Sequence, residues 1–265
     1  MVTAEQLAHF ETFGFLALRK AFSREEVMAI SEEFDRLLDE DREGEPFPGE
    51  TRQSLYGIAE RSELLTDLVE DDRIYKTMEG LFGPGFHWLC SEGNMYVGDT
   101  AWHPDGTNLD FRPMKVSLYL DPLSKDTGCL RVIPGSHKLP FHEDLKSGSL
   151  FSGTTWFEKF GMEGSEVPAF PLESEPGDVL FLNMNLWHAA FGGVPGRRHL
   201  AVNFVPEPTN EEHLEMLRRN HEGNLGHIRR LQYSQPGRVF TDEFLHSDRP
   251  RIRRLASKWV ELGLN

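Results

Sequence analysis

The sequence is poor in cysteine, because its 265 residues include only Cys90 and Cys129. Two cysteines at this spacing make neither a disulfide framework nor a zinc-finger pattern, so both classes of small stapled domain are excluded. Both residues lie in apolar, strand-like runs, where a buried free thiol is the usual state. We therefore expect two free thiols and a reducing, cytoplasmic compartment.

The sequence also lacks a surplus of positive charge and any long apolar run. Its 28 lysines and arginines face 43 aspartates and glutamates, which gives a net charge of −15. This charge argues against a surface for nucleic acid or anionic membrane. No leader pattern and no membrane span are visible. We therefore expect the partner to be a small-molecule substrate and neither nucleic acid nor a membrane. The oligomeric state stays open.

No repeat or low-complexity linker divides the chain, which predicts a single domain over residues 1–265. The sequence pattern predicts mainly helix over about residues 1–85, many short strands over about 86–206, and helix again over about 207–265. Many short strands with turn signals, flanked by helices, predict a mainly β fold of the jelly-roll, cupin-like type.

One stretch inside the strand-rich part has little strand character. Residues 138–176 are a long excursion that contains Trp156 and Phe157. Excursions of this length often serve as lids or binding loops. The two aromatic residues are equally compatible with a lid and with local packing.

The candidate metal site begins with the pattern His-x-Asp. This pattern occurs three times, as His103/Asp105, His142/Asp144 and His246/Asp248. Only His103/Asp105 lies between two strand-like segments, and residues two apart on a strand point to the same side. A third ligand from a distant strand, such as His188, would complete a 2-His-1-carboxylate facial triad. That ligand set suits ferrous iron, because it leaves coordination positions open.

A longer ordered set of motifs carries a family resemblance. It consists of His103-x-Asp105, the run Gly128-Cys129-Leu130-Arg131-Val132-Ile133-Pro134-Gly135-Ser136-His137-Lys138, the run Gly177-Asp178-Val179-Leu180-Phe181, His188, and Arg197-Arg198. This set resembles the phytanoyl-CoA dioxygenase family. The resemblance implies a double-stranded β-helix and a dioxygenase that uses Fe(II), 2-oxoglutarate and O2.

Residue by residue, the resemblance implies that His103, Asp105 and His188 ligate iron. It also implies an arginine that binds the oxoglutarate carboxylate and begins a strand with an aromatic residue seven positions later. Arg197 with Phe204 fits that spacing, and strand parity turns Arg197 toward the barrel. Arg198 is kept as the alternative.

The chain departs from the family where a hydroxyl residue often follows two positions after the distal histidine. Ala190 stands there, so another group must help to hold the oxoglutarate carboxylate. Alternate residues of a strand point to the same side, so Lys115, Ser117 and Tyr119 are expected to point into the barrel together. On the neighbouring strand, Asn94 or Tyr96 is expected to add one more contact to the oxoglutarate.

The resemblance implies hydroxylation of a C–H bond of a small metabolite, with succinate and CO2 as co-products. Asp105 supports hydroxylation, since related halogenases lack the carboxylate. The first alternative is a metal-dependent cupin-type enzyme that does not use 2-oxoglutarate. A non-catalytic binding protein is the second, and nothing in the chain names the substrate.

Overall fold

The computed structural model describes residues 2–106, 108–147, 161–231 and 237–264. Trp156 and Phe157 lie outside these residues. The elements, in chain order, are α1 (Ala4–Phe13), β1 (Phe15–Leu18), α2 (Arg24–Asp41), β2 (Gln53–Tyr56), the 3-10 helix η1 (Ala59–Arg61), α3 (Glu63–Glu70), α4 (Asp72–Phe82), β3 (Phe86–Tyr96), β4 (Thr100–His103), β5 (Met114–Tyr119), β6 (Leu130–Val132), α5 (Phe141–Ser147), the 3-10 helix η2 (Gly164–Glu166), β7 (Phe170–Leu172), β8 (Val179–Asn183), β9 (His188–Ala190), β10 (Arg197–Pro206), α7 (Glu211–Leu231), α8 (Asp242–Leu245) and α9 (Pro250–Leu262).

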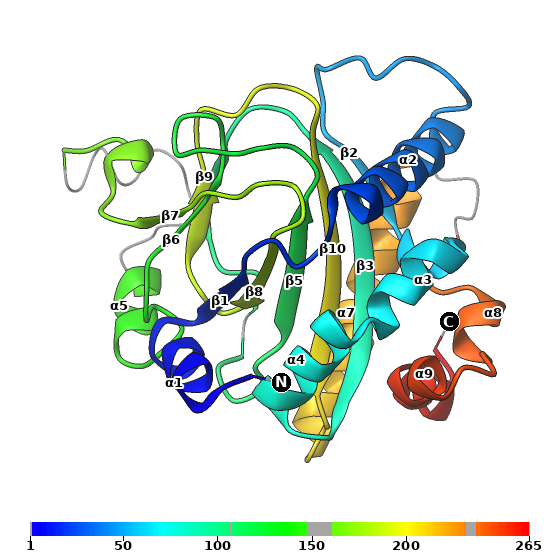
Figure 1. Ribbon diagram of the computed structural model, residues 1–265. Coiled ribbons are helices and arrows are strands. Elements are labelled where there is room, and N and C mark those ends of the chain that lie inside the picture. Colours follow the sequence, from blue (N-terminus) through cyan, green and yellow to red (C-terminus); the bar gives the residue numbers. More distant parts are fainter. Residues whose placement is uncertain (1, 107, 148–160, 232–236, 265) are drawn as a thin grey trace.

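The strands form two antiparallel sheets that face each other as a jelly roll, which confirms the predicted fold class (Figure 1). The larger sheet has six strands in the order β1-β8-β5-β10-β3-β2. The smaller sheet has four, in the order β4-β9-β6-β7. Strand β10 pairs with both β3 and β5, so it lies inside the larger sheet and is fixed along both edges.

Helices begin where the sequence supplies capping groups. Thr3 with Gln6, and Ser23 with Glu26, each form the reciprocal pair of hydrogen bonds of a capping box. Gly14 ends α1 in the left-handed conformation, at φ 85°, which favours glycine. Helices α1 and α2 therefore agree with the helical character predicted for about residues 1–85.

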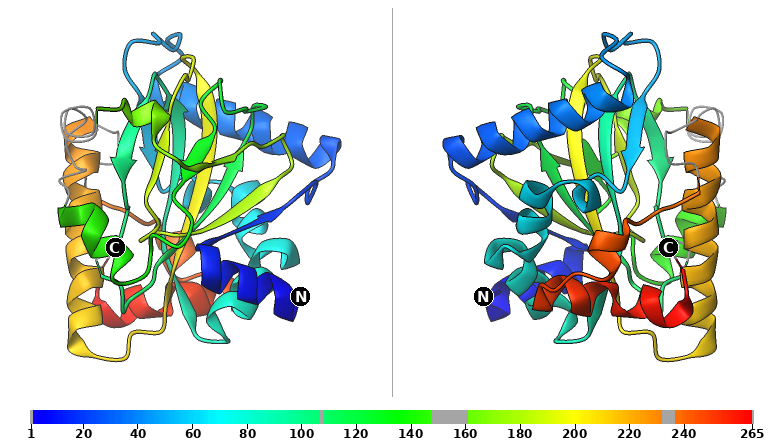
Figure 2. Two further views of the ribbon diagram at one scale, coloured as in Figure 1. Left: turned by 90° about the vertical axis from the view of Figure 1, so that its left-hand side faces the viewer. Right: turned by 90° about the vertical axis from the view of Figure 1, so that its right-hand side faces the viewer.

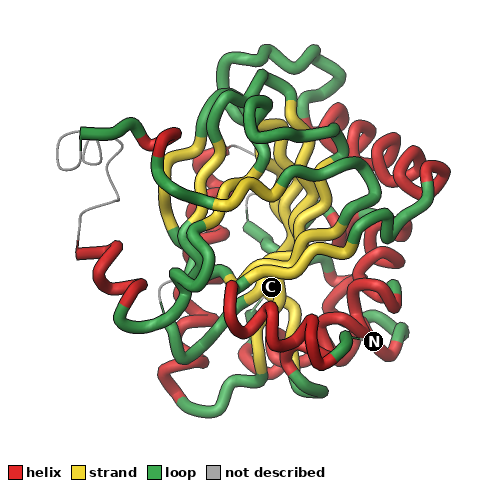
Figure 3. Tube along the Cα trace, turned by 60° about the vertical axis from the view of Figure 1, so that its left-hand side comes forward, coloured by secondary structure: helices red, strands yellow, loops and turns green. Residues whose placement is uncertain are grey.

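The main core lies between the larger sheet and the helices, which gather on the outside of the strands (Figure 3). On β10, Leu200, Val202 and Phe204 are fully buried in this core, as the strand parity predicted. Helix α7 runs upright along one side of the molecule (Figure 2). Burial of these apolar side chains is the main source of stability in such a layer.

A second apolar cluster joins the two sheets. It contains Leu180 and Leu182 of β8 together with Leu130 and Val132 of β6 and Leu172 of β7. Side chains that alternate along a strand reach opposite faces, so β8 contributes to both cores. This cluster packs the inner faces of the two sheets together, and its members Leu130 and Leu182 also line the cavity described in the next subsection.

Some elements differ from the prediction. Strand β3 is continuous over Phe86–Tyr96, longer than the short strands predicted for this region, because β10 pairs along its whole length. Strand β2 lies in the region that was predicted to be helical, and it forms by pairing with β3. The excursion over residues 138–176 contains α5, η2 and β7. Local sequence does not show these pairings, since the partner strands are far away in the chain.

The two cysteines are free and buried, as predicted. Among the described residues, no helix has both the length and the apolar character needed to cross a lipid bilayer. The cytoplasmic compartment and the single-domain organisation stay predictions.

Candidate metal site

The candidate ligands His103, Asp105 and His188 converge in space. His103 ends β4, His188 begins β9, and these two strands pair so that the two histidines face each other directly. One ligand atom from each of the three side chains lies within 4.8 Å of the others. Among the residues described, this is the group of His, Cys, Asp and Glu side chains that could hold a metal ion.

The distances within this group fit a shared metal ion. Asp105 Oδ1 lies 3.6 Å from His103 Nε2, and its Oδ2 lies 3.4 Å from His188 Nε2. Ligand atoms bonded to one ion at about 2.0–2.2 Å, at adjacent positions, lie roughly 3 Å apart. A small inward movement of the side chains therefore completes a three-ligand site.

Each histidine is oriented by the main chain. Nδ1 of His103 lies 2.7 Å from the carbonyl oxygen of Ala101, and Nδ1 of His188 lies 2.8 Å from that of Leu186. A carbonyl oxygen only accepts, so in each ring Nδ1 carries a proton and its N–H donates, and Nε2 is the nitrogen that can bind a metal ion when the ring is neutral. Metal-ligating histidines are usually fixed in this way through their other ring nitrogen.

The charges around the site favour an ionised aspartate. Burial alone would raise the pKa of Asp105, but Lys115 and the two histidines outweigh it and hold that pKa well below its usual value. Lys115 Nζ lies 2.8 Å from Asp105 Oδ2. Burial lowers the pKa of His188 to about 4, so this imidazole is neutral near pH 7. An ionised carboxylate and a neutral imidazole are the forms that bind metal.

The three side chains line a cavity of about 200 Å³ between the two sheets. Its wall also includes predicted cosubstrate contacts from the larger sheet, namely Lys115, Ser117, Tyr119 and Arg197, and the alternative residue Tyr96. Ala190 lines the cavity as well. The sequence had therefore predicted about half of the residues in this wall, while the roles of these residues in binding stay predictions.

Arg197 and Arg198 lie on opposite faces of β10. Arg197 is 4% exposed and lines the cavity, where its guanidinium donates to the carbonyl oxygens of Gly128, at 2.6 Å, and of Gly98. A side chain added at Gly128 or Gly193 would overlap this guanidinium, so glycine leaves the space that it fills. Arg198 turns outward and pairs with Asp121 and with Asp35 of α2.

Asn94 does not line the cavity. Its side-chain oxygen accepts hydrogen bonds from Arg52 and from Ser54 Oγ, the latter at 2.5 Å. Asn94 therefore lies behind Arg52, and the structure offers no direct path from it to a bound cosubstrate. Tyr96, two residues further along β3, has the position that was expected for either residue.

Among the residues of the cavity wall that the sequence did not predict, three carry a charged or imidazole side chain: Arg52, Glu92 and His199. His199 is buried, stacks on Tyr119 and lies 2.9 Å from Ser117 Oγ through its Nε2. Parity could have identified His199, which is two residues after Arg197, and Glu92, which is two residues before Asn94. Arg52 carries no local signal, because pairing of β2 with β3 brings it to the cavity.

Two tryptophans next to the candidate ligands pack in the interior, and the other two histidines of the His-x-Asp pattern lie elsewhere. Trp102 and Trp187 are buried together in a small apolar cluster next to the candidate ligands. His142 is buried in α5, and His246 is exposed after α8. The two other His-x-Asp pairs therefore lie apart from the metal group.

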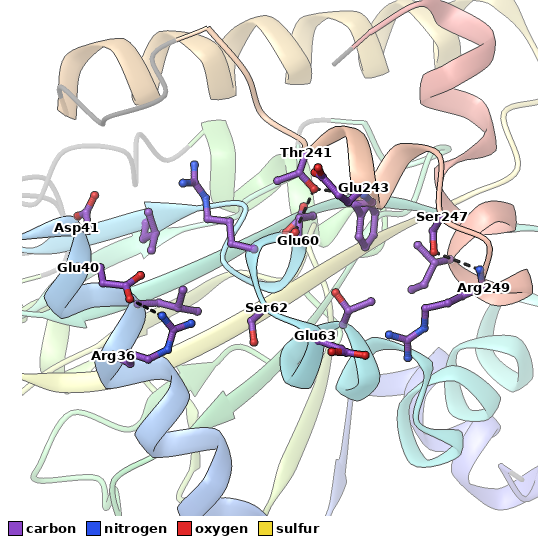
Figure 4. Close-up of a pocket in the computed structure, with 16 residues that line it drawn as sticks. Arg36, Glu40, Asp41, Glu60, Ser62, Glu63, Thr241, Glu243, Ser247 and Arg249 are labelled. Atoms are coloured by element: carbon purple, nitrogen blue, oxygen red, sulfur yellow. Dashed lines mark hydrogen bonds and ion pairs between the residues drawn. The ribbon is translucent and has the colours of Figure 1, made fainter.

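A larger cavity, of about 700 Å³, lies among the outer helices and contains none of the candidate ligands (Figure 4). In its wall Arg36 pairs with Glu40, and Thr241 Oγ1 donates to the carbonyl oxygen of Glu60 at 3.1 Å. Glu60 is buried at its base, where it accepts hydrogen bonds from Trp88 Nε1, at 2.7 Å, and from Ser91 Oγ. These contacts tie η1 to β3, which indicates a structural role.

Glu60 should make the stability of the protein depend on pH. Burial raises the pKa of Glu60, although the hydrogen bonds from Ser91 and Trp88 lower it in part. The unfolded carboxyl titrates near about 4.3. The contribution of Glu60 to stability is therefore fully present below that pH, and it is lost as pH rises through the higher folded pKa. Glu60→Gln removes this ionisation. As the pH rises from about 4.3 through the folded pKa of Glu60, the free energy of unfolding of the variant should therefore fall less than that of the wild type.

Urea unfolding at a series of pH values measures this difference. Glu63→Gln is the matched control, because Glu63 is an exposed carboxylate at the same cavity. Equal pH dependence for Glu60→Gln and the wild type would contradict the prediction.

Comparison with known proteins agrees with this geometry. The family model described as "Phytanoyl-CoA dioxygenase (PhyH)" matches residues 10–198. An ectoine dioxygenase of Streptomyces avermitilis is 28% identical over 155 residues, which are 52% of this chain and 52% of that protein. The peroxisomal phytanoyl-CoA dioxygenase of Rattus norvegicus is 24% identical over 224 residues, which are 72% of this chain and 64% of that protein. The chain thus matches about half the length of this ectoine dioxygenase and about two thirds of the length of the phytanoyl-CoA dioxygenase.

Solved structures share the fold. HygX from Streptomyces hygroscopicus, with nickel and 2-oxoglutarate bound, superposes with a TM-score of 0.62 at 22% identity and covers 78% of this chain and 88% of its own. EctD from S. alaskensis, with bound Fe, gives a TM-score of 0.58 at 22% identity, and the match covers 78% of this chain and 77% of EctD. At these identities the likeness establishes the fold alone.

Proposed function

The chain belongs to the phytanoyl-CoA dioxygenase family, and from this premise we propose that it is an Fe(II)- and 2-oxoglutarate-dependent dioxygenase that hydroxylates a C–H bond of a small metabolite. Succinate and CO2 are the co-products. The observation that carries the proposal is the convergence of His103, Asp105 and His188 in the cavity that Arg197 also lines.

The donor set fits ferrous iron. Two neutral imidazole nitrogens and one carboxylate on one side of the ion leave open positions for a chelating keto acid and for O2. When bound, the iron and 2-oxoglutarate together supply the oxidising chemistry, and the protein supplies orientation. His103, Asp105 and His188 would hold the ion. Lys115 donates to Asp105 and so orients the ligand carboxylate.

Arg197 is the proposed anchor for the distal carboxylate of 2-oxoglutarate. A guanidinium can bind a carboxylate through two parallel hydrogen bonds. Its Nε is buried without a hydrogen-bond partner among the described residues. The walls around it, formed by Tyr96, Tyr119 and Leu182, limit the access of water to the reacting groups.

One observation favours the alternative of a metal-dependent cupin-type enzyme that does not use 2-oxoglutarate. Both terminal nitrogens of Arg197 already donate to main-chain oxygens, those of Gly128 and Gly98. An arginine used only to join these loops would have the same contacts. The two functions predict the same metal ligands and differ in whether the keto acid binds.

Anaerobic titration of the iron-loaded protein with 2-oxoglutarate tests the proposal. Chelation should produce a weak visible charge-transfer band, and admission of O2 should then release succinate. Metal binding without the band and without succinate would favour the alternative. Hydroxylation itself is tested by the product, since one succinate should form for each hydroxylated molecule of a substrate found in a metabolite panel.

A further inference from the structure

The charge of the cavity is opposite in sign to the charge of the whole chain. Its wall carries three cations, on Arg52, Lys115 and Arg197, and two carboxylates, on Glu92 and Asp105. This leaves one positive charge in excess, whereas the chain has a net charge of −15. Ferrous iron and the dianion of 2-oxoglutarate would cancel each other, so the excess remains for the substrate to balance.

Two of the three cations have roles next to the metal site. Lys115 pairs with Asp105 at 2.8 Å, and Arg197 fills the space between Gly128 and Gly193. Arg52 is the third. Its partner in the wall is Glu92, at 3.5 Å, which is the outer limit of a hydrogen-bond distance. This loose contact leaves the charge of Arg52 incompletely balanced.

The guanidinium of Arg52 is held in a fixed orientation. Its Nε and Nη2 donate to Asn94 Oδ1 at 3.0 and 2.6 Å, and its central carbon lies 4.4 Å from the centre of the Tyr96 ring. Asn94 is itself fully buried. The Arg52 side chain remains 40% exposed, and its Nη1 makes no hydrogen bond to a described residue. Arg52 therefore presents an oriented donor group to the cavity.

We propose that Arg52 binds a carboxylate of the substrate, so that the substrate is a small organic acid or amino acid. This inference rests on the proposed function, because it assumes that the metal site and the cosubstrate occupy the same cavity. A carboxylate carries the single negative charge that the excess requires, and its two oxygens match the planar donors of arginine. The cavity has a volume of about 200 Å³, which is below the usual range for ligand pockets, and it would also hold the cosubstrate, so the space favours a compact substrate.

A succinate-release assay on matched compounds tests the proposal. The panel pairs free amino acids and short organic acids with their primary amides, which have the same skeleton without the charge. In the wild type, the acids should exceed their amides in kcat/KM by roughly 10- to 100-fold, as expected for a lost charge-assisted hydrogen bond. Arg52→Met should remove this preference, and Arg52→Lys should keep part of it.

Arg112→Met is the matched control, because Arg112 is an exposed arginine paired with Glu11 outside the cavity wall. It should keep the wild-type preference for acids. The proposal is overturned if no acid in the panel is turned over, if the amides are turned over equally well, or if Arg52→Met leaves the preference unchanged. Absence of the oxoglutarate band in the wild-type protein is a different outcome, because it removes the proposed function itself.

Discussion

His103→Ala should abolish iron binding and lower oxoglutarate turnover by more than about a hundred-fold. Loss of a residue that merely orients a metal ligand already costs about 10- to 100-fold, so loss of a ligand should cost at least as much. The two remaining candidate ligands, Asp105 and His188, lie 3.4 Å apart and would hold the ion through two protein atoms only. Metal content and succinate release measure the two effects.

The matched control is His246→Ala, which changes the same residue in another copy of the His-x-Asp pattern. His246 and Asp248 are both exposed, so this variant should keep iron and activity. Both variants should unfold at temperatures close to that of the metal-free wild type, because the His103 side chain is itself about one-third exposed, at 34%. Equal iron content in His103→Ala and His246→Ala would exclude His103 as a ligand.

Arg197→Met should weaken the binding of 2-oxoglutarate by roughly 10- to 100-fold while the metal ion stays bound. The substitution removes the charged donor proposed for the distal carboxylate, and a hydrogen bond to a charged group is worth about 1.5–3 kcal/mol. The keto acid end would still chelate the iron, so the charge-transfer band should appear at a higher concentration of 2-oxoglutarate. Anaerobic titration of the band measures this shift.

The adjacent arginine provides the control for that experiment. Arg198→Met removes an ion pair with Asp121 on the outer face of β10 and should change the affinity for 2-oxoglutarate little. Arg197→Lys keeps the positive charge and should recover part of the affinity. If Arg197→Met binds 2-oxoglutarate as tightly as the wild type, or if Arg198→Met has the larger effect, Arg197 is not the anchor.

Much of this site could be predicted because its signals are local. Strand alternation separates Arg197 from Arg198, and it also predicts which face of β5 carries Lys115, Ser117 and Tyr119. The strand context distinguishes His103 from the other two histidines of the same pattern. Each of these inferences depends on a few neighbouring residues only.

Arg52 and the full extent of β3 could not be predicted in the same way. Arg52 reaches the cavity because Gln53 pairs with Met95, a contact between residues that are far apart in the chain. Asn94 is a case of the opposite kind. Strand alternation correctly predicts the face of β3 on which it lies, but it does not predict that Arg52 covers its side chain. Pairing and coverage depend on tertiary structure, which short patterns do not encode.

The placement of the candidate groups on two sheets has a mechanical consequence. His103 and His188 belong to the smaller sheet, whereas Lys115 and Arg197 belong to the larger one. In the proposed function, the distance between a metal ion held by the histidines and a keto acid held by Arg197 therefore depends on the spacing of the two sheets. The apolar cluster that contains Leu130 and Leu182 lies between these sheets. Smaller side chains in that cluster would change the spacing of the sheets without removing a candidate ligand. We expect such a change to uncouple oxygen consumption from product formation.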